Sequence, residues 1–228
     1  MTTPFKLIVF DLDGTLVDTR RDLAESTNVL IGELGGTPLN EATIASMVGT
    51  GVNIWLKQAL ALAGIAPFPP HAIDRFNTIY DQRLLNHTRP YEGMSATVAQ
   101  LAVVTKLAVL TNKLHHATVK ILEGLELAKF FTQIAGAGGA YPLKPAPGGL
   151  KAIMEQAEAK PPETVLVGDS PVDLQTARNA EVRICLARFG FGFVDVSPFE
   201  LRGDELFIDR PDELPSLLGY ASGPPSEI

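Results

Sequence analysis

Short apolar runs, each followed by a polar residue, recur along this chain of 228 residues. They are rich in Val, Ile and Leu and lack strict alternation, which is typical of strands buried on both faces of a parallel sheet. Four runs are clear and two are weaker: 6–10, 107–110, 164–167 and 183–187, then 133–137 and 206–209. Helical patterns lie between them, and a last helix is expected at 212–218. We therefore predict an α/β fold with a Rossmann-like, doubly wound parallel sheet.

One region, from about 18 to 86, has only helical periodicity. Its apolar residues form three stripes at spacings of three and four, and the first two stop at glycines. The stripes are Leu23, Thr27, Leu30, Ile31 and Leu34 before Gly35; Trp55, Leu56 and Leu60 before Gly64; and Ile73, Phe76, Tyr80 and Leu84. We predict that residues 1–17 and 88–220 form the α/β core domain. Residues 18–87 would be an inserted helical cap domain, and 221–228 a flexible tail.

Composition narrows the class of protein. No apolar run approaches the roughly 20 residues of a membrane helix, and Asp11 and Asp13 interrupt the first apolar stretch too early for a secretory signal. A single cysteine, Cys185, precludes an intrachain disulfide and fits a reducing compartment. The net charge of −7 argues against nucleic-acid binding. We expect a cytoplasmic protein with no nucleic-acid or membrane partner, and leave its oligomeric state open.

Polar residues stand where the predicted strands end. They are Asp11, Asp13, Gly14 and Thr15; then Thr111 and Asn112; then Lys144; then Asp169, Ser170 and Asp173. Ligands of open α/β sheets bind beyond the carboxyl ends of the strands, so we expect these side chains to converge. A carboxylate there can attack phosphorus to form an acyl phosphate. A second carboxylate two residues on can protonate the leaving oxygen and later deprotonate water.

The negative charge of these residues indicates that cations are needed at the site. Asp11, Asp169, Asp173 and a phosphate dianion would repel one another in one pocket. Mg²⁺ prefers hard oxygen ligands, and Asp169 is placed to share it with Asp11. The Thr111 hydroxyl and the Lys144 ammonium can bind phosphoryl oxygens. The pattern therefore predicts magnesium-dependent phosphoryl transfer through an enzyme carboxylate.

The order of these motifs resembles the haloacid dehalogenase superfamily, over residues 5 to about 218. The sequences FDLDGTLVD, VLTNK and KPAP and the helical insertion are most similar to phosphoglycolate phosphatases and their near relatives. The resemblance implies a small phosphorylated metabolite as substrate, Asp11 as nucleophile and Asp13 as acid and base. It implies Mg²⁺ held by Asp11, the backbone carbonyl of Asp13 and Asp169 with support from Asp173, and phosphate bound by Thr111, Asn112 and Lys144. Asp173 also fits a simple helix cap.

Two other functions stay open. A phosphomutase of the β-phosphoglucomutase type would share Asp13 and the helical cap, and would move phosphate between sugar hydroxyls. A non-catalytic scaffold would be expected to lack one of the chemical groups, yet all are present. The resemblance implies that dehalogenases and phosphonate hydrolases lack an aspartate at the Asp13 position. Asp13 therefore favours a phosphatase or a phosphomutase.

Several residues in and around the insertion allow two interpretations. Gly49-Thr50-Gly51 is either a turn between helices or a loop that covers the active site. Arg20 and Lys57 could bind a substrate carboxylate, although solvated positions are favoured. Ala180-Glu181 replaces the Ala-Gly that is usual in the family, so we expect the loop there to be built differently.

Overall fold

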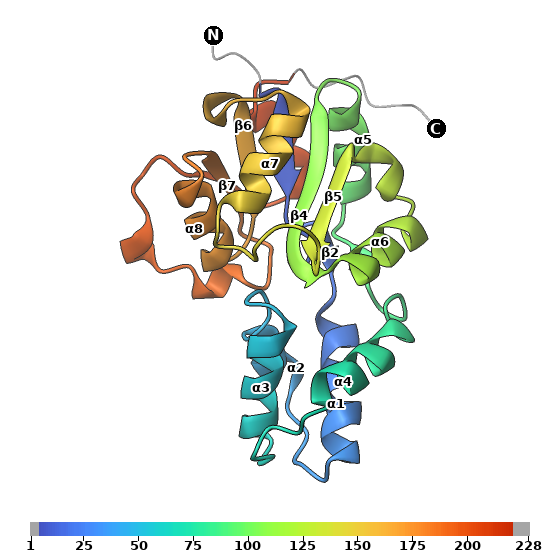
Figure 1. Ribbon diagram of the computed structural model, residues 1–228. Coiled ribbons are helices and arrows are strands. Elements are labelled where there is room, and N and C mark those ends of the chain that lie inside the picture. Colours follow the sequence, from blue (N-terminus) through green and yellow to red (C-terminus); the bar gives the residue numbers. More distant parts are fainter. Residues whose placement is uncertain (1–4, 221–228) are drawn as a thin grey trace.

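The computed structural model describes residues 5–220, so the tail predicted at 221–228 lies outside the described residues. A parallel six-stranded sheet with the order β5-β4-β1-β6-β7-β8 forms its centre (Figure 1). All six predicted strands are present, which confirms the predicted α/β fold. Their bounds are β1 Leu7–Phe10, β4 Lys106–Leu114, β5 Gln133–Ala137, β6 Thr164–Gly168, β7 Arg183–Ala187 and β8 Leu206–Ile208.

Strand β1 is buried on both faces, which explains its unbroken apolar sequence. Successive side chains of a strand point to opposite faces. Ile8 and Phe10 pack with α5, α6 and α9, whereas Leu7 and Val9 pack with α7 and α8 on the other face. The bounds of these helices are α5 Met94–Ala102, α6 His115–Gly124, α7 Gly148–Ala157, α8 Pro171–Asn179 and α9 Leu214–Leu217. Five short 3-10 helices are Ala128–Phe130, Pro161–Glu163, Phe193–Asp195, Pro198–Glu200 and Pro211–Glu213.

The strand order places a ligand-binding edge beside β1. From β1 the chain goes outward to β4 and β5, then returns to the other side of β1 for β6. This reversal is the topological switch point at which open α/β sheets bind ligands. The carboxyl ends of β1, β4 and β6 therefore meet at one edge, as expected from the sequence.

Four helices follow β1 along the chain and gather at that edge of the sheet, below it in Figure 1. They are α1 Arg20–Glu33, α2 Glu41–Ala45, α3 Val52–Leu62 and α4 Ala72–Asp81. The three predicted helical stripes correspond to α1, α3 and α4, and α2 was not predicted because five residues give little periodicity. The domain boundaries at 17/18 and 87/88 stay a prediction.

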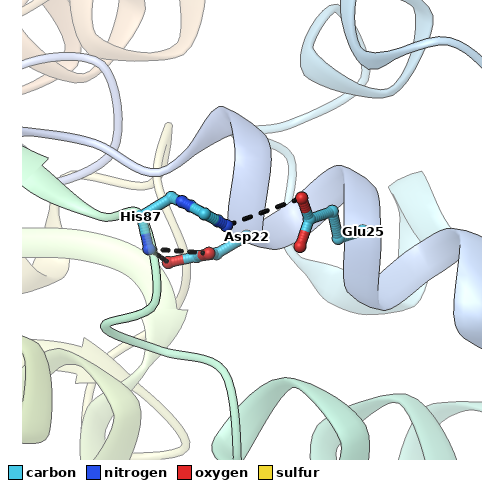
Figure 2. A group of neighbouring side chains, drawn as sticks. All are labelled: Asp22, Glu25 and His87. Carbon is cyan, nitrogen blue, oxygen red and sulfur yellow. Dashed lines mark hydrogen bonds and ion pairs between the residues drawn. The ribbon is translucent and has the colours of Figure 1, made fainter.

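Two short strands connect the helices to the sheet. Val17–Asp18 (β2) pairs antiparallel with Arg89–Pro90 (β3), so the entry and exit of the insertion run side by side. Figure 2 shows further contacts between the entry segment, with Asp22 and Glu25, and the exit segment, with His87. The buried Asp22 carboxylate accepts hydrogen bonds from the backbone nitrogens of His87 (3.0 Å) and Thr88 (2.8 Å) and from the Thr88 hydroxyl (2.8 Å). His87 Nε2 also lies 3.6 Å from Glu25. Asp22 therefore holds the two connections together.

The replacement of the usual glycine at position 181 has a structural consequence. Glu181 follows α8 with a φ of 59°, in the left-handed region that favours glycine. The chain thus takes a glycine-type turn at a residue that carries a side chain.

Candidate active site

The predicted site residues from four different strand ends converge around Lys144. Its ammonium lies 2.8 Å from Asp11 Oδ1 and 2.6 Å from Asp173 Oδ1. Asp11 directly follows β1, whereas Asp173 lies in the first turn of α8 and also caps that helix together with Ser170. Only 2% of the Lys144 side chain is exposed. Residues that are 29 and 133 positions away from Lys144 along the chain thus share one buried ion cluster.

Asn112 holds the segment that carries Lys144. The Lys144 backbone nitrogen donates to Asn112 Oδ1 (2.7 Å), and Asn112 Nδ2 donates to the Lys144 carbonyl (2.9 Å). The same Nδ2 also donates to the Gly49 carbonyl (2.9 Å). This last bond joins the core to the Gly49-Thr50-Gly51 loop and so favours the interpretation that the loop covers the active site. Both ends of the Asn112 amide therefore bond to backbone atoms. Phosphate binding by Asn112 stays a prediction.

Three buried carboxylates can hold a metal ion. Asp11, Asp169 and Asp173 each offer an oxygen, and these oxygens lie within 4.8 Å of one another. Asp169 is oriented by the Thr15 hydroxyl (3.1 Å) and the Gly192 backbone nitrogen (2.7 Å). Asp11 Oδ1 is buried, lies 2.8 Å from the Lys144 ammonium and has no other partner within residues 5–220. The three carboxylates supply hard oxygens, a donor set that fits a divalent cation such as Mg²⁺.

The cluster carries more negative charge than it can stabilise alone. Burial raises the pKa of Asp11 from 3.8 to about 7, and Asp173 adds to this, while Lys144 acts in the opposite direction. Burial also raises the pKa of Asp169 well above its usual range, again with contributions from Asp173 and Asp11. Burial acts to lower the pKa of Lys144, but Asp11 and Asp173 outweigh it and hold that pKa above its usual value. A cation bound here would therefore relieve repulsion between the carboxylates.

Gly14 allows the turn after β1 to approach Asp169. Its φ is 85°, and an added Cβ would stand 2.1 Å from Asp169 Oδ2. Any side chain would therefore displace this carboxylate.

Asp13 is held by a residue that we did not single out from the sequence. Lys113 Nζ lies 2.9 Å and 3.1 Å from the two Asp13 oxygens, and the Thr19 hydroxyl donates to Asp13 Oδ1 (2.7 Å). The Asp13 charge outweighs the effect of burial and raises the pKa of Lys113. Lys113 follows Thr111 by two positions in β4, in a part of the strand where the pairing with β5 shifts register, and both residues line the cavity.

A cavity of about 50 Å³ lies beside these residues, between the sheet edge and the helices of the insertion. Asp11, Asp13, Thr111 and Lys144 line its core side, and the apolar side chains of Leu23, Val48, Val52, Trp55 and Phe76 line the other. One water needs roughly 10–15 Å³ on the same measure, so the cavity has room for only a few water-sized groups. Arg20 and Lys57 do not line the cavity: Arg20 forms a two-point ion pair with Asp18, and Lys57 is exposed.

Comparison with known proteins identifies the family. A family model described as haloacid dehalogenase-like hydrolase matches residues 8–187. The chain belongs to this family. The hydrolase is 32% identical to a phosphoglycolate phosphatase of Caulobacter vibrioides over 95% of its own length and 94% of the relative's. It is 35% identical to a phosphoglycolate phosphatase of Agrobacterium fabrum, with 92% and 91% of the two chains covered.

Solved structures agree with this assignment. A crystal structure from Haemophilus somnus, described as a predicted phosphoglycolate phosphatase, superposes with a TM-score of 0.87 at 25% identity. The match covers 95% of the hydrolase and 99% of the other chain. The hydrolase thus has the fold of this family along nearly its whole length. No helix within residues 5–220 has the length and apolar character to cross a membrane.

Proposed function

We propose that this hydrolase releases phosphate from a small phosphomonoester, such as phosphoglycolate, through a phospho-aspartyl intermediate on Asp11. The observation that carries the proposal is the contact between Asp11 and Lys144 beside Asp13, in a small cavity at the switch point. The names of the curated relatives support phosphoglycolate as the first substrate to test.

Each side chain has a role that its position supports. With Asp13 protonated, Asp11 attacks phosphorus, the bond between phosphorus and the leaving oxygen breaks, and this oxygen takes the proton of Asp13. Asp13, now ionised, then takes a proton from the water that attacks the acyl phosphate. Lys113 and Thr19 hold Asp13 in place through their hydrogen bonds. The Thr111 hydroxyl and the Lys144 ammonium bind the phosphoryl oxygens, where the charge of the transition state lies.

Asp11 and Asp169 would hold Mg²⁺ together with the Asp13 backbone carbonyl, and Asp173 would support them. When bound, the ion would supply positive charge next to the phosphoryl group.

Residues of the insertion line one side of the cavity, and the Gly49 carbonyl accepts a hydrogen bond from Asn112 Nδ2. A cover in this position would limit the access of bulk water to the reacting atoms. The small cavity favours a leaving group of a few atoms over the hexose of a phosphomutase.

The test is phosphate release from a panel of small phosphomonoesters, measured with Mg²⁺ and with EDTA. We expect release that requires the metal ion and a preference for phosphoglycolate. No release from folded protein would contradict the proposal. Turnover that appears only after addition of an activating sugar bisphosphate would favour the phosphomutase.

Mg²⁺ should stabilise the folded protein more at high pH than at low pH. The folded-state pKa of Asp11 is raised from 3.8 to about 7, so without metal the folded state binds more protons than the unfolded state in this interval. Stability therefore falls as pH rises from about 4 to 7. Mg²⁺ favours the ionised carboxylates and should reverse this loss. We expect a larger increase in Tm on adding Mg²⁺ at about pH 8 than at about pH 5. Equal increases with NaCl of the same ionic strength would contradict metal binding.

A further inference from the structure

Lys113 provides a cation next to the place of the leaving group. Within residues 5–220, two lysines line the cavity, Lys144 and Lys113. Lys144 lies against Asp11 and Asp173, at the proposed place of the phosphoryl group. His116 also lines the cavity, but its ring is exposed and paired with Asp81 at 3.1 Å. Lys113 lies against Asp13, the proposed proton donor to the leaving oxygen. The leaving group must therefore enter next to the Lys113 ammonium.

Tyr80 of α4 presents a second donor to the same place. Its hydroxyl is buried and has no hydrogen-bond partner within the described chain. The hydroxyl lies beside Lys113, whose ammonium stands 4.7 Å from the centre of the Tyr80 ring. Burial raises the pKa of Tyr80 to about 12, so the hydroxyl keeps its proton. A buried hydroxyl without a partner is unfavourable, and an acceptor that entered the cavity would satisfy it.

We propose that Lys113 and the Tyr80 hydroxyl form a binding site for a carboxylate on the leaving group of the substrate. This inference rests on the proposed phosphatase function and adds the two residues that would select, among short phosphomonoesters, those with a carboxylate close to the ester oxygen. The ammonium and the hydroxyl both donate to the carboxylate oxygens. Such charge-assisted hydrogen bonds are among the stronger ones in proteins.

The position and size of the cavity support this assignment. Lys113 comes from the core and Tyr80 from the insertion, so a carboxylate bound by both would contact both parts of the protein at once. The cavity of about 50 Å³ allows few atoms between this carboxylate and the phosphorus. Arg20 and Lys57, which the sequence offered for the same task, lie outside the cavity lining. An alternative is that Lys113 only positions Asp13, in which case its loss would affect every phosphomonoester equally.

The experiment compares phosphoglycolate with ethyl phosphate, which has the same number of carbons but no carboxylate. The value of kcat/KM is measured for both esters with the wild type, Lys113→Met and Tyr80→Phe. Lys57→Met controls for the loss of a lysine charge. Tyr91→Phe is the matched control for Tyr80, because the Tyr91 hydroxyl is also buried without a partner but does not line the cavity.

We expect the wild type to prefer phosphoglycolate. The ratio of the two kcat/KM values should fall roughly 10- to 100-fold in Lys113→Met and about tenfold in Tyr80→Phe. The two control variants should keep the wild-type ratio. Tyr80→Phe removes only a hydroxyl that lacks a partner, so it should fold and decides the question even if Lys113→Met does not fold.

Three results would overturn the inference. A wild-type enzyme with equal kcat/KM on both esters has no carboxylate site, although the proposed phosphatase function would stand. An unchanged ratio in both Lys113→Met and Tyr80→Phe, with equal losses on the two esters, would mean that these residues only position Asp13 or the cap. A folded wild-type protein that hydrolyses neither ester would remove the proposed function, and the carboxylate site with it.

Discussion

Asp11→Asn is expected to lower phosphate release at least about 10⁴-fold without unfolding the protein. The asparagine amide cannot form the acyl phosphate, and no other described carboxylate occupies the end of β1. Because Asp11 is buried and its pKa is raised to about 7, a neutral side chain of the same shape should be tolerated. Turnover is measured as phosphate release, and folding by circular dichroism and Tm.

The exposed Asp195, which does not line the cavity, offers a matched control. Asp195→Asn should retain wild-type turnover and stability. Substantial turnover by Asp11→Asn would mean that the nucleophile is another group. Loss of both folding and activity would leave the role of Asp11 as a nucleophile without support.

Lys144→Ala should weaken catalysis and stability together. Removal of this ammonium leaves the Asp11 and Asp173 carboxylates buried without their cation. Breaking a buried ion pair in this way costs about 3–5 kcal/mol of unfolding free energy. The phosphoryl oxygens also lose a ligand, so we expect kcat/KM to fall about 10³-fold. Urea unfolding and phosphate release measure the two effects.

Metal ions provide a further check on Lys144. Mg²⁺ should restore part of the lost stability in Lys144→Ala, because it neutralises the same carboxylates, but should not restore turnover. Lys151→Ala on the exposed side of α7 is the control and should behave as the wild type. A loss of stability with normal turnover would assign Lys144 a purely structural role.

The fold could be predicted because its strongest signals are local. β1 and β6 are buried on both faces, so they require unbroken apolar sequences that are easy to recognise. The helices α1, α3 and α4 each bury one face and therefore show a spacing of three and four. By contrast, β2 and β3 have two residues each, and α2 has five. Elements this short depend on their neighbours for stability and have no periodic pattern of their own.

The candidate site was predictable for a related reason. Asp11 and Asp169 directly follow β1 and β6, and Thr111 lies in the second half of β4. The parallel arrangement of strands brings these parts to one edge. Lys113 was missed because its partner Asp13 lies 100 positions away along the chain. The motif VLTNK contains Lys113, but nothing in the motif indicates its contact with Asp13.

The sequence by itself determined the class of fold, the order of its elements and the chemical groups at the strand ends, because these depend on local patterns of apolar and polar residues. The tertiary structure alone decided which of these groups form ion pairs with one another and which hold other residues in place. Lys144 pairs with two carboxylates, Asn112 bonds to the backbone, and Lys113 pairs with Asp13. Ion pairs, hydrogen bonds and buried hydroxyls depend on distances of a few ångströms between segments far apart in the chain. No local pattern specifies those distances.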